Sequence, residues 1–231
     1  EEGRTSWAIT RGAVVLALAA LLAACVGSST HSDVTAPAAS GDAMHGLVEG
    51  NARFVAGRSL HPRQTPETRQ ELQNSQRPFA AILGCSDSRV PPEVVFDQGL
   101  GDLFVARVAG NVIDDEILGS FEYTVEHLHT QLIVVLGHNR CGAVAAARDT
   151  IAGGGHAEGH IESLVDAIRP AVEETKGQDA EATCRANVRY MVAALRAAGP
   201  VLKPAVESGA LRIVGATYDL DTGKVTFLGD S

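Results

Sequence analysis

Apolar and polar positions alternate along this chain in blocks whose lengths are typical of strands and helices. Two short apolar runs, Phe79–Gly84 and Leu132–Gly137, each end at a glycine. An apolar run of this length that stops at a turn residue is typical of a buried β-strand. A third run of the same kind, Leu103–Val108, lies between them, so we expect three buried strands in this part of the chain.

In the segments around these runs, apolar residues recur at the spacing that predicts an amphipathic helix. Helices are predicted at Met44–Gly57, Pro66–Gln73, Glu93–Phe96, Asp114–His129, Gly142–Ile151, Ile161–Glu174, Ala180–Ala198 and Val201–Glu207. Asp42 and Thr65 stand where they can cap the first two helices, because their side-chain oxygens can accept from free N–H groups of a first turn. The Gly-rich segment Gly153–His160 predicts a loop.

The carboxyl-terminal part ends in two further strands. Leu211–Tyr218 and Lys224–Leu228 flank the turn signal Asp221–Gly223, which predicts a hairpin. Strands and helices alternate before this hairpin. The predicted fold class is therefore α/β, with a mostly parallel β-sheet flanked by helices, an antiparallel C-terminal edge and an N-terminal helical arm.

The amino terminus has the pattern of a targeting segment. Arg4 and Arg11 precede the apolar run Gly12–Ala24, and this order predicts a signal peptide. The run is short for a membrane span. The segment Leu22–Cys25 resembles the lipobox of bacterial lipoproteins, in which the cysteine is acylated. An ordinary signal peptide with a chance cysteine and a single anchor helix are the alternatives.

Three segments follow from this pattern. We expect residues 1–25 to be a signal peptide with lipidation at Cys25, residues 26–43 to be a flexible tether, and residues 44–231 to be the folded domain. Val26, and not an aspartate, follows the cysteine. By resemblance to lipoproteins, this favours anchoring in the outer membrane. The protein is therefore expected to be exported and periplasmic, with a lipid anchor as its only contact with the membrane.

Charge limits the partners of this protein. The chain has 231 residues and a formal net charge of −9, and its length suits one sizeable globular core. A nucleic-acid-binding protein needs a basic surface to contact phosphates. The acidic balance therefore argues against nucleic acid as a partner and is ordinary for a soluble domain.

Two thiols and an imidazole are predicted to meet at one edge of the sheet. Cys85 follows the first buried strand, and His138 and Cys141 follow the run Leu132–Gly137. Ligands bind at the carboxyl ends of parallel strands. Two thiolates and one imidazole are a common Zn²⁺ ligand set, and three protein ligands leave a fourth position for water, as in catalytic sites.

The cysteines also allow an alternative to a metal site. An exported protein could instead join Cys85 and Cys141 in a disulfide, although a disulfide requires neither His138 nor the charged residues after Cys85. Cys184 falls in a helical pattern and is expected to be a small buried hydrophobe. Cys141 is predicted to stand at a helix amino terminus, where backbone dipoles favour its thiolate.

Asp87 and Arg89 follow Cys85 at intervals of two residues. In an extended segment, such positions face the same way, so all three side chains can surround one metal. Arg89 can bind the carboxylate bidentately and keep it ionised. Asp87 could then orient a zinc-bound hydroxide, or it could bind the zinc itself and close the site. The alternative is an ordinary salt bridge in a turn.

The segments Cys85–Arg89, Phe96–Asn111 and His138–Gly142 together closely resemble the β-class carbonic anhydrases. The resemblance covers roughly residues 45–230. It implies reversible hydration of carbon dioxide by zinc-hydroxide, with Zn²⁺ on Cys85, His138 and Cys141, and with Asp87 and Arg89 as an orienting and gating pair.

The same resemblance implies further site residues and partners. Gln98 and the backbone of Gly142 would line the carbon dioxide site. The protein would be a homodimer or a dimer of dimers, with the amino-terminal helices around the partner and the active cleft at the interface. Other functions remain open at this point. They are a carbonyl sulfide or carbon disulfide hydrolase on the same scaffold, a non-catalytic zinc-binding lipoprotein, and a thiol enzyme with Cys85 as nucleophile.

Overall fold

The computed structural model describes residues 40–229 of the chain. The predicted signal peptide, Cys25 and all but the end of the predicted tether lie outside these residues and stay predictions. None of the helices within residues 40–229 combines the length and the apolar character that crossing a membrane requires.

A five-stranded sheet forms the centre of the fold, in the order β2-β1-β3-β4-β5. The first four strands in this order are parallel, and β5 pairs antiparallel with β4. The strands are β1 (Ala80–Gly84), β2 (Leu103–Arg107), β3 (Leu132–His138), β4 (Arg212–Tyr218) and β5 (Val225–Phe227). The predicted fold class, with its antiparallel C-terminal edge, is therefore confirmed.

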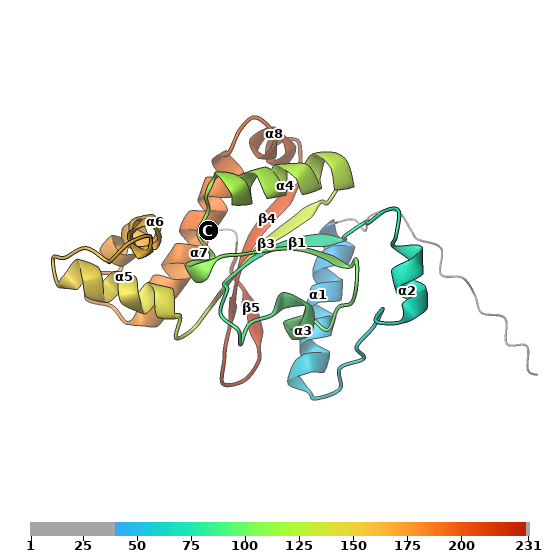
Figure 1. The fold of residues 1–231 in the computed structure, drawn as a ribbon, viewed down its shortest axis with the longest axis horizontal. Helices are drawn as coiled ribbons and strands as arrows, with labels where there is room; N and C mark the ends of the chain where they lie inside the picture. The colour runs from blue at the N-terminus through green and yellow to red at the C-terminus, as the bar shows by residue number, and fades with distance from the viewer. Residues whose placement is uncertain (1–39, 230–231) are drawn as a thin grey trace, which may run out of the picture. The chain divides into compact units, whose positions relative to one another are not determined.

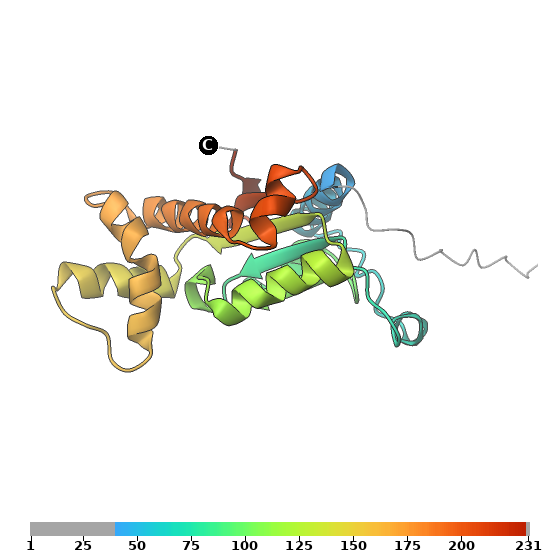
Figure 2. The same ribbon diagram turned by 90° about the horizontal axis from the view of Figure 1, so that it is seen from above.

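Helices cover both faces of this sheet, with α4 and α8 on one side of the strands and α1 and α3 on the other (Figure 1). The helices are α1 (Ser40–Val55), α2 (Pro66–Glu71), α3 (Pro92–Val95), α4 (Asp115–Leu128), α5 (Gly142–Ala152), α6 (Ile161–Glu174), α7 (Ala180–Ala197) and α8 (Leu202–Glu207), with a 3₁₀ turn η1 at Ala109–Asn111. Figure 2 shows the long helices α4 and α7 running alongside the strands.

Successive residues of β1 belong to different halves of the core. Ala81 and Leu83 pack with the cluster beneath α4, α7 and α8, whereas Ala80 and Ile82 pack with the cluster beneath α1 and α3. Side chains of a strand point alternately to the two faces of a sheet. A strand buried on both faces must be apolar throughout, which explains the continuous apolar runs in the sequence.

The amino-terminal helix differs from its prediction in its start and in its cap. Helix α1 begins at Ser40, inside the predicted tether, and Ala43 is already buried. Asp42 therefore lies in the first turn, where it complements the helix dipole, and the prediction that it is the cap was wrong. The helix packs on its own sheet with Leu47 fully buried. Its contact with a partner subunit stays a prediction.

Hydrogen bonds join α1 to α3 and to the β4–β5 hairpin. The amide of Asn51 donates to the carbonyls of Val95 and Gly223 at 3.0 and 2.9 Å and accepts from Val225 N–H at 2.8 Å. The second predicted cap is confirmed, since Thr65 Oγ1 accepts from the N–H of Thr68 at 3.3 Å. These bonds satisfy backbone groups that the strands and helices leave unpaired.

Candidate metal centre and active site

Three side chains that could bind a metal meet at the carboxyl edge of the sheet. Cys85 follows β1, His138 is the last residue of β3, and Cys141 is the N-cap of α5. Their candidate ligand atoms all lie within 4.8 Å of one another, and all three residues are buried. Both cysteines are free thiols, so the alternative prediction of a disulfide between them was wrong. The predicted convergence is confirmed.

The donor set fits a zinc ion. His138 is 1% exposed, and its Nε2 is buried without a hydrogen-bond partner. A buried polar atom without a partner is costly, and a metal ion at the centre of the cluster would satisfy it. Two thiolates and an imidazole are ligands that zinc prefers, and they leave a coordination position open.

The two thiols differ in acidity. The thiol of Cys141, the ring of His138 and the N–H groups of Asp87 and Gly110 lower the pKa of Cys85 against the effect of burial. The neighbouring Cys85, burial and the charge on Cys85 raise the pKa of Cys141. Without a cation the pair therefore holds one thiolate, and a bound cation is what makes the second one favourable.

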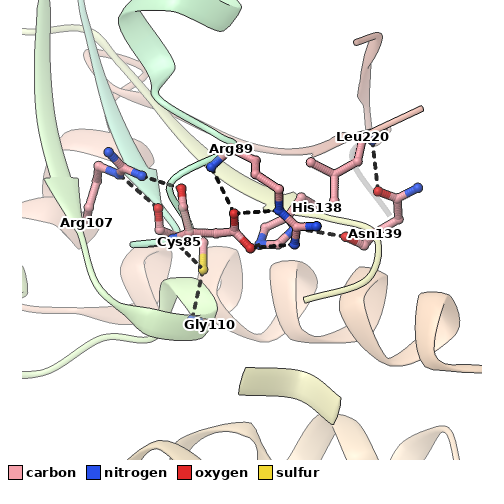
Figure 3. A network of polar contacts seen from close by, with 8 residues as sticks. Cys85, Arg89, Arg107, Gly110, His138, Asn139 and Leu220 are labelled. Carbon is pink, nitrogen blue, oxygen red and sulfur yellow. Dashed lines mark hydrogen bonds and ion pairs between the residues drawn. The ribbon is translucent and has the colours of Figure 1, made fainter. Parts of the chain in front are cut away.

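Backbone amides of two loops face the Cys85 sulfur. Gly110 N–H donates to Cys85 Sγ at 3.3 Å and Asp87 N–H donates to it at 3.4 Å (Figure 3). Gly110 has φ 73°, and a Cβ there would lie 2.8 Å from Ile168 Cδ1, so a glycine is required. The buried amide of Asn187 donates to Gly110 O at 2.8 Å and holds this turn in place.

Asp87 and Arg89 form the predicted bidentate pair beside the cluster. Arg89 Nε donates to Asp87 Oδ1 at 2.9 Å and Nη2 donates to Oδ2 at 2.7 Å. The arginine hydrogen bonds lower the pKa of Asp87 far below its usual range. Asp87 Oδ2 also lies 3.9 Å from His138 Nε2, so this carboxylate faces the position that a metal would occupy.

Arg107, which sequence reasoning missed, holds the loop that carries Cys85 and Asp87. Its Nε donates to Cys85 O at 2.9 Å and its Nη2 donates to Asp87 O at 2.6 Å. Arg107 ends β2 directly opposite Gly84 of β1. A charged residue at the end of an apolar run was the available signal, but only the pairing of the strands shows which carbonyls it reaches.

The acceptor for His138, which the sequence could not identify, is a backbone carbonyl. His138 Nδ1 donates to Asn139 O at 2.8 Å. This bond places the ring proton on Nδ1 and leaves Nε2 free to bind a metal. The neighbouring carbonyl therefore sets both the tautomer and the orientation of the ligand.

The two predicted substrate-site residues have different surroundings. Gln98 Nε2 donates to Phe96 O at 2.9 Å and to Gly46 O at 3.5 Å. Gly142 is the first residue of α5, where the backbone N–H has no partner within the helix. Their roles in lining a substrate site stay predictions.

The chain matches known proteins over most of its length. The family model described as "Carbonic anhydrase" matches residues 80–225. Carbonic anhydrase 2 of Mycobacterium tuberculosis is 45% identical over 185 residues, covering 79% of this chain and 89% of that protein. The carbonic anhydrase of Mycolicibacterium smegmatis is 42% identical over 202 residues, covering 81% and 94% of the two chains.

Solved structures agree with these relatives. A tetrameric β-carbonic anhydrase of Sordaria macrospora superposes with a TM-score of 0.64 at 26% identity, covering 81% of this chain and 98% of that one. The Coccomyxa β-carbonic anhydrase in complex with acetazolamide gives 0.61 at 28% identity, with 79% and 84% covered. The chain therefore belongs to the carbonic anhydrase family, in its β class.

Proposed function

We propose that this protein catalyses the reversible hydration of carbon dioxide to bicarbonate and a proton, with Zn²⁺ held by Cys85, His138 and Cys141. The observation that carries the proposal is the buried cluster of two thiols around a histidine nitrogen that has no other partner. Membership of the family supports the same reaction. The relatives quoted above are named carbonic anhydrases, which favours carbon dioxide over carbonyl sulfide or carbon disulfide.

Each group in the site has a distinct task in this reaction. Zinc, when bound, supplies Lewis acidity that lowers the pKa of water to about 7. The N–H groups of Gly110 and Asp87 stabilise the Cys85 thiolate, and Asn139 O orients the His138 ring. These contacts keep Cys85 and His138 in the protonation states that metal binding requires, whereas Cys141, with its raised pKa, would lose its proton as the cation binds.

The carboxylate of Asp87 orients the attacking water. The arginine keeps this carboxylate ionised, so it acts as a hydrogen-bond acceptor and holds the water for attack on the carbon of carbon dioxide. Because Asp87 Oδ2 lies 3.9 Å from His138 Nε2, this carboxylate stands beside the three candidate ligands and could itself bind the metal. We therefore also assign the gating role to Asp87, with Arg89 as the group that holds it back.

We further propose that the protein is a homodimer or a dimer of dimers. β2 is an edge strand that pairs only with β1 within the described residues, and Leu103, Phe104 and Val105 on it are only half-buried. An apolar edge strand is a surface that a second strand can cover. The neighbour from Sordaria macrospora is described as tetrameric. The cleft between subunits would then be completed by residues such as Gln98.

Export and lipidation at Cys25 form a separate proposal that rests on the sequence. The apolar run Gly12–Ala24 and the segment Leu22–Cys25 support it. Mass spectrometry of the protein from its native membrane should show two or three acyl chains on Cys25. An unmodified, freely soluble protein would refute lipidation while leaving the enzymatic proposal intact.

Stopped-flow measurement of carbon dioxide hydration tests the main proposal. The zinc-loaded protein should accelerate hydration well above the buffer rate, chelation should remove this activity, and added zinc should restore it. The matched control is Cys141→Ser, which removes one ligand while preserving the size of the side chain. A loaded protein that gives no rate above buffer at mildly alkaline pH would refute the enzymatic proposal.

A further inference from the structure

The loop that carries His138 is attached to the C-terminal hairpin by the side chain of Asn139. Asn139 Nδ2 donates to Asp219 Oδ2 at 3.1 Å, and Asn139 Oδ1 accepts from Leu220 N–H at 2.9 Å. The backbone N–H of Asn139 donates to Tyr218 O at 3.1 Å. One residue thus makes three hydrogen bonds to a segment about eighty positions away, while its own carbonyl accepts from His138. Figure 3 shows the bond from Leu220 and the neighbouring His138 ring.

The hairpin end of this contact is held in place by its own turn. Asp219 Oδ1 accepts from the N–H groups of Asp221 and Thr222 and from Thr222 Oγ1, at 3.0, 2.8 and 2.9 Å. Asp219 therefore uses one carboxylate oxygen for the turn and the other for Asn139. Asn51 of α1 attaches the same turn to the first helix, because its amide donates to the carbonyl of Gly223 and accepts from the N–H of Val225.

The backbone on the far side of Asn139 needs this support. Arg140 has φ 52°, in the left-handed region that a residue with a side chain adopts only when its surroundings impose it. This conformation follows the peptide group whose carbonyl accepts from His138 Nδ1. If the contacts of Asn139 were lost, that carbonyl would be free to relax away from the ring, and the ring would lose the bond that fixes its orientation.

We propose that Asn139 is a positioning residue for the metal ligand His138, held by Asp219 of the β4–β5 hairpin. Asn139 does not touch the metal or the substrate; it fixes the carbonyl that orients the imidazole. Partners of this kind commonly change metal affinity by about 10- to 100-fold when they are removed. The inference rests on the proposed zinc site.

The first test measures how fast the zinc-loaded protein gives up its metal to a chelator. Asn139→Ala should release zinc about 10- to 100-fold faster than the wild type. Cobalt in place of zinc should show an altered absorption spectrum in this variant, because the imidazole is no longer held in one orientation. Asp219→Asn sets two amide NH₂ groups against each other while keeping an acceptor for the turn, and it provides a second variant if Asn139→Ala does not fold.

Rescue separates positioning from a general structural role. Asn139→Asp combined with Asp219→Asn exchanges donor and acceptor across the contact, so this double variant should recover slow zinc release and the original cobalt spectrum. The matched control is Asp221→Asn. It removes the exposed Arg140–Asp221 ion pair, 2.7 Å long between the same two loops, and should leave zinc release unchanged.

Each result supports or overturns the inference. Wild-type zinc release in both Asn139→Ala and Asp219→Asn would overturn it, as would equally fast release in Asp221→Asn. A double variant that releases zinc as fast as Asn139→Ala would also overturn the assigned pairing with Asp219. A wild type that takes up no zinc would refute the proposed function as well, whereas tight zinc binding unaffected by these variants would refute only the role of Asn139.

Discussion

Two aspartates of this fold pair with arginines at almost the same distance, but in different surroundings. Arg53 Nε lies 2.6 Å from Asp97 Oδ2, and Arg89 Nη2 lies 2.7 Å from Asp87 Oδ2. Both carboxylates have a lowered pKa. Neither the distance within the pair nor the direction of the pKa shift alone therefore tells which pair takes part in chemistry.

The two pairs differ in whether the carboxylate has a direction open to a further partner. Asp97 has a fully buried side chain, and N–H groups of Leu60 and His61 together with Arg53 use both of its oxygens. The side chain of Asp87 is 16% exposed, and its Oδ2 faces His138. A carboxylate whose bonds are all used within the protein joins parts of the fold, whereas one with a direction left open toward a metal site can act there.

The largest expected effect comes from Asp87→Asn. The amide cannot supply the charged acceptor that orients the attacking water, so kcat/KM for carbon dioxide hydration should fall by at least about 100-fold. Zinc content should be unchanged, because the three metal ligands remain. Elemental analysis and stopped-flow kinetics on the same sample check both points, and unchanged turnover would show that this pair is only structural.

A smaller loss is expected from Arg89→Lys. Lysine keeps the positive charge but cannot make the two parallel bonds of the guanidinium, so Asp87 is held less firmly. Activity should fall by about tenfold, in the range found for residues that orient another functional group. Kinetics of the two variants side by side should rank Arg89→Lys above Asp87→Asn in activity; the reverse order would contradict the assigned roles.

The corresponding change at the buried pair should affect stability rather than catalysis. The carboxylate of Asp97 accepts from Arg53 and from two backbone N–H groups. Because Asp97→Asn removes its negative charge, the free energy of unfolding should fall by about 2 kcal/mol. Chemical denaturation measures this loss. Turnover per zinc-loaded folded molecule should match the wild type, and a fall as large as that of Asp87→Asn would remove the distinction between the two pairs.

The smallest expected effect is the pH dependence of the difference in free energy of unfolding between the wild type and Asp97→Asn. Burial raises the pKa of Asp97, but hydrogen bonds from Leu60, Arg53 and His61 outweigh it, so the folded-state pKa is lowered. The ionised carboxylate therefore stabilises the fold above the unfolded-state pKa of about 3.9, and this contribution is lost as pH falls through the folded-state pKa.

Denaturation of the wild type and Asp97→Asn across this range measures the dependence. The difference in free energy of unfolding should be constant between about pH 5 and pH 7 and should shrink below about pH 4. A difference that does not change with pH would mean that the charge of Asp97 contributes little.

The sequence by itself determined the strands, the helices and the three candidate metal ligands. Buried strands and amphipathic helices leave a local periodicity, and parallel strands bring residues at their carboxyl ends to one edge. Cys85, His138 and Cys141 could therefore be placed together without coordinates, and so could the neighbouring pair of Asp87 and Arg89, because these two residues are close in the chain.

The tertiary structure alone decided which groups support that site. The bonds from Arg107 to Cys85 O and from Asn139 to Asp219 join residues about twenty and eighty positions apart, and no local pattern records them. The start of α1 at Ser40 was likewise missed, because small polar residues there are compatible with a tether until Ala43 packs on the sheet. Local periodicity reports whether a residue is buried, whereas its partners depend on strand register and on the packing of distant segments.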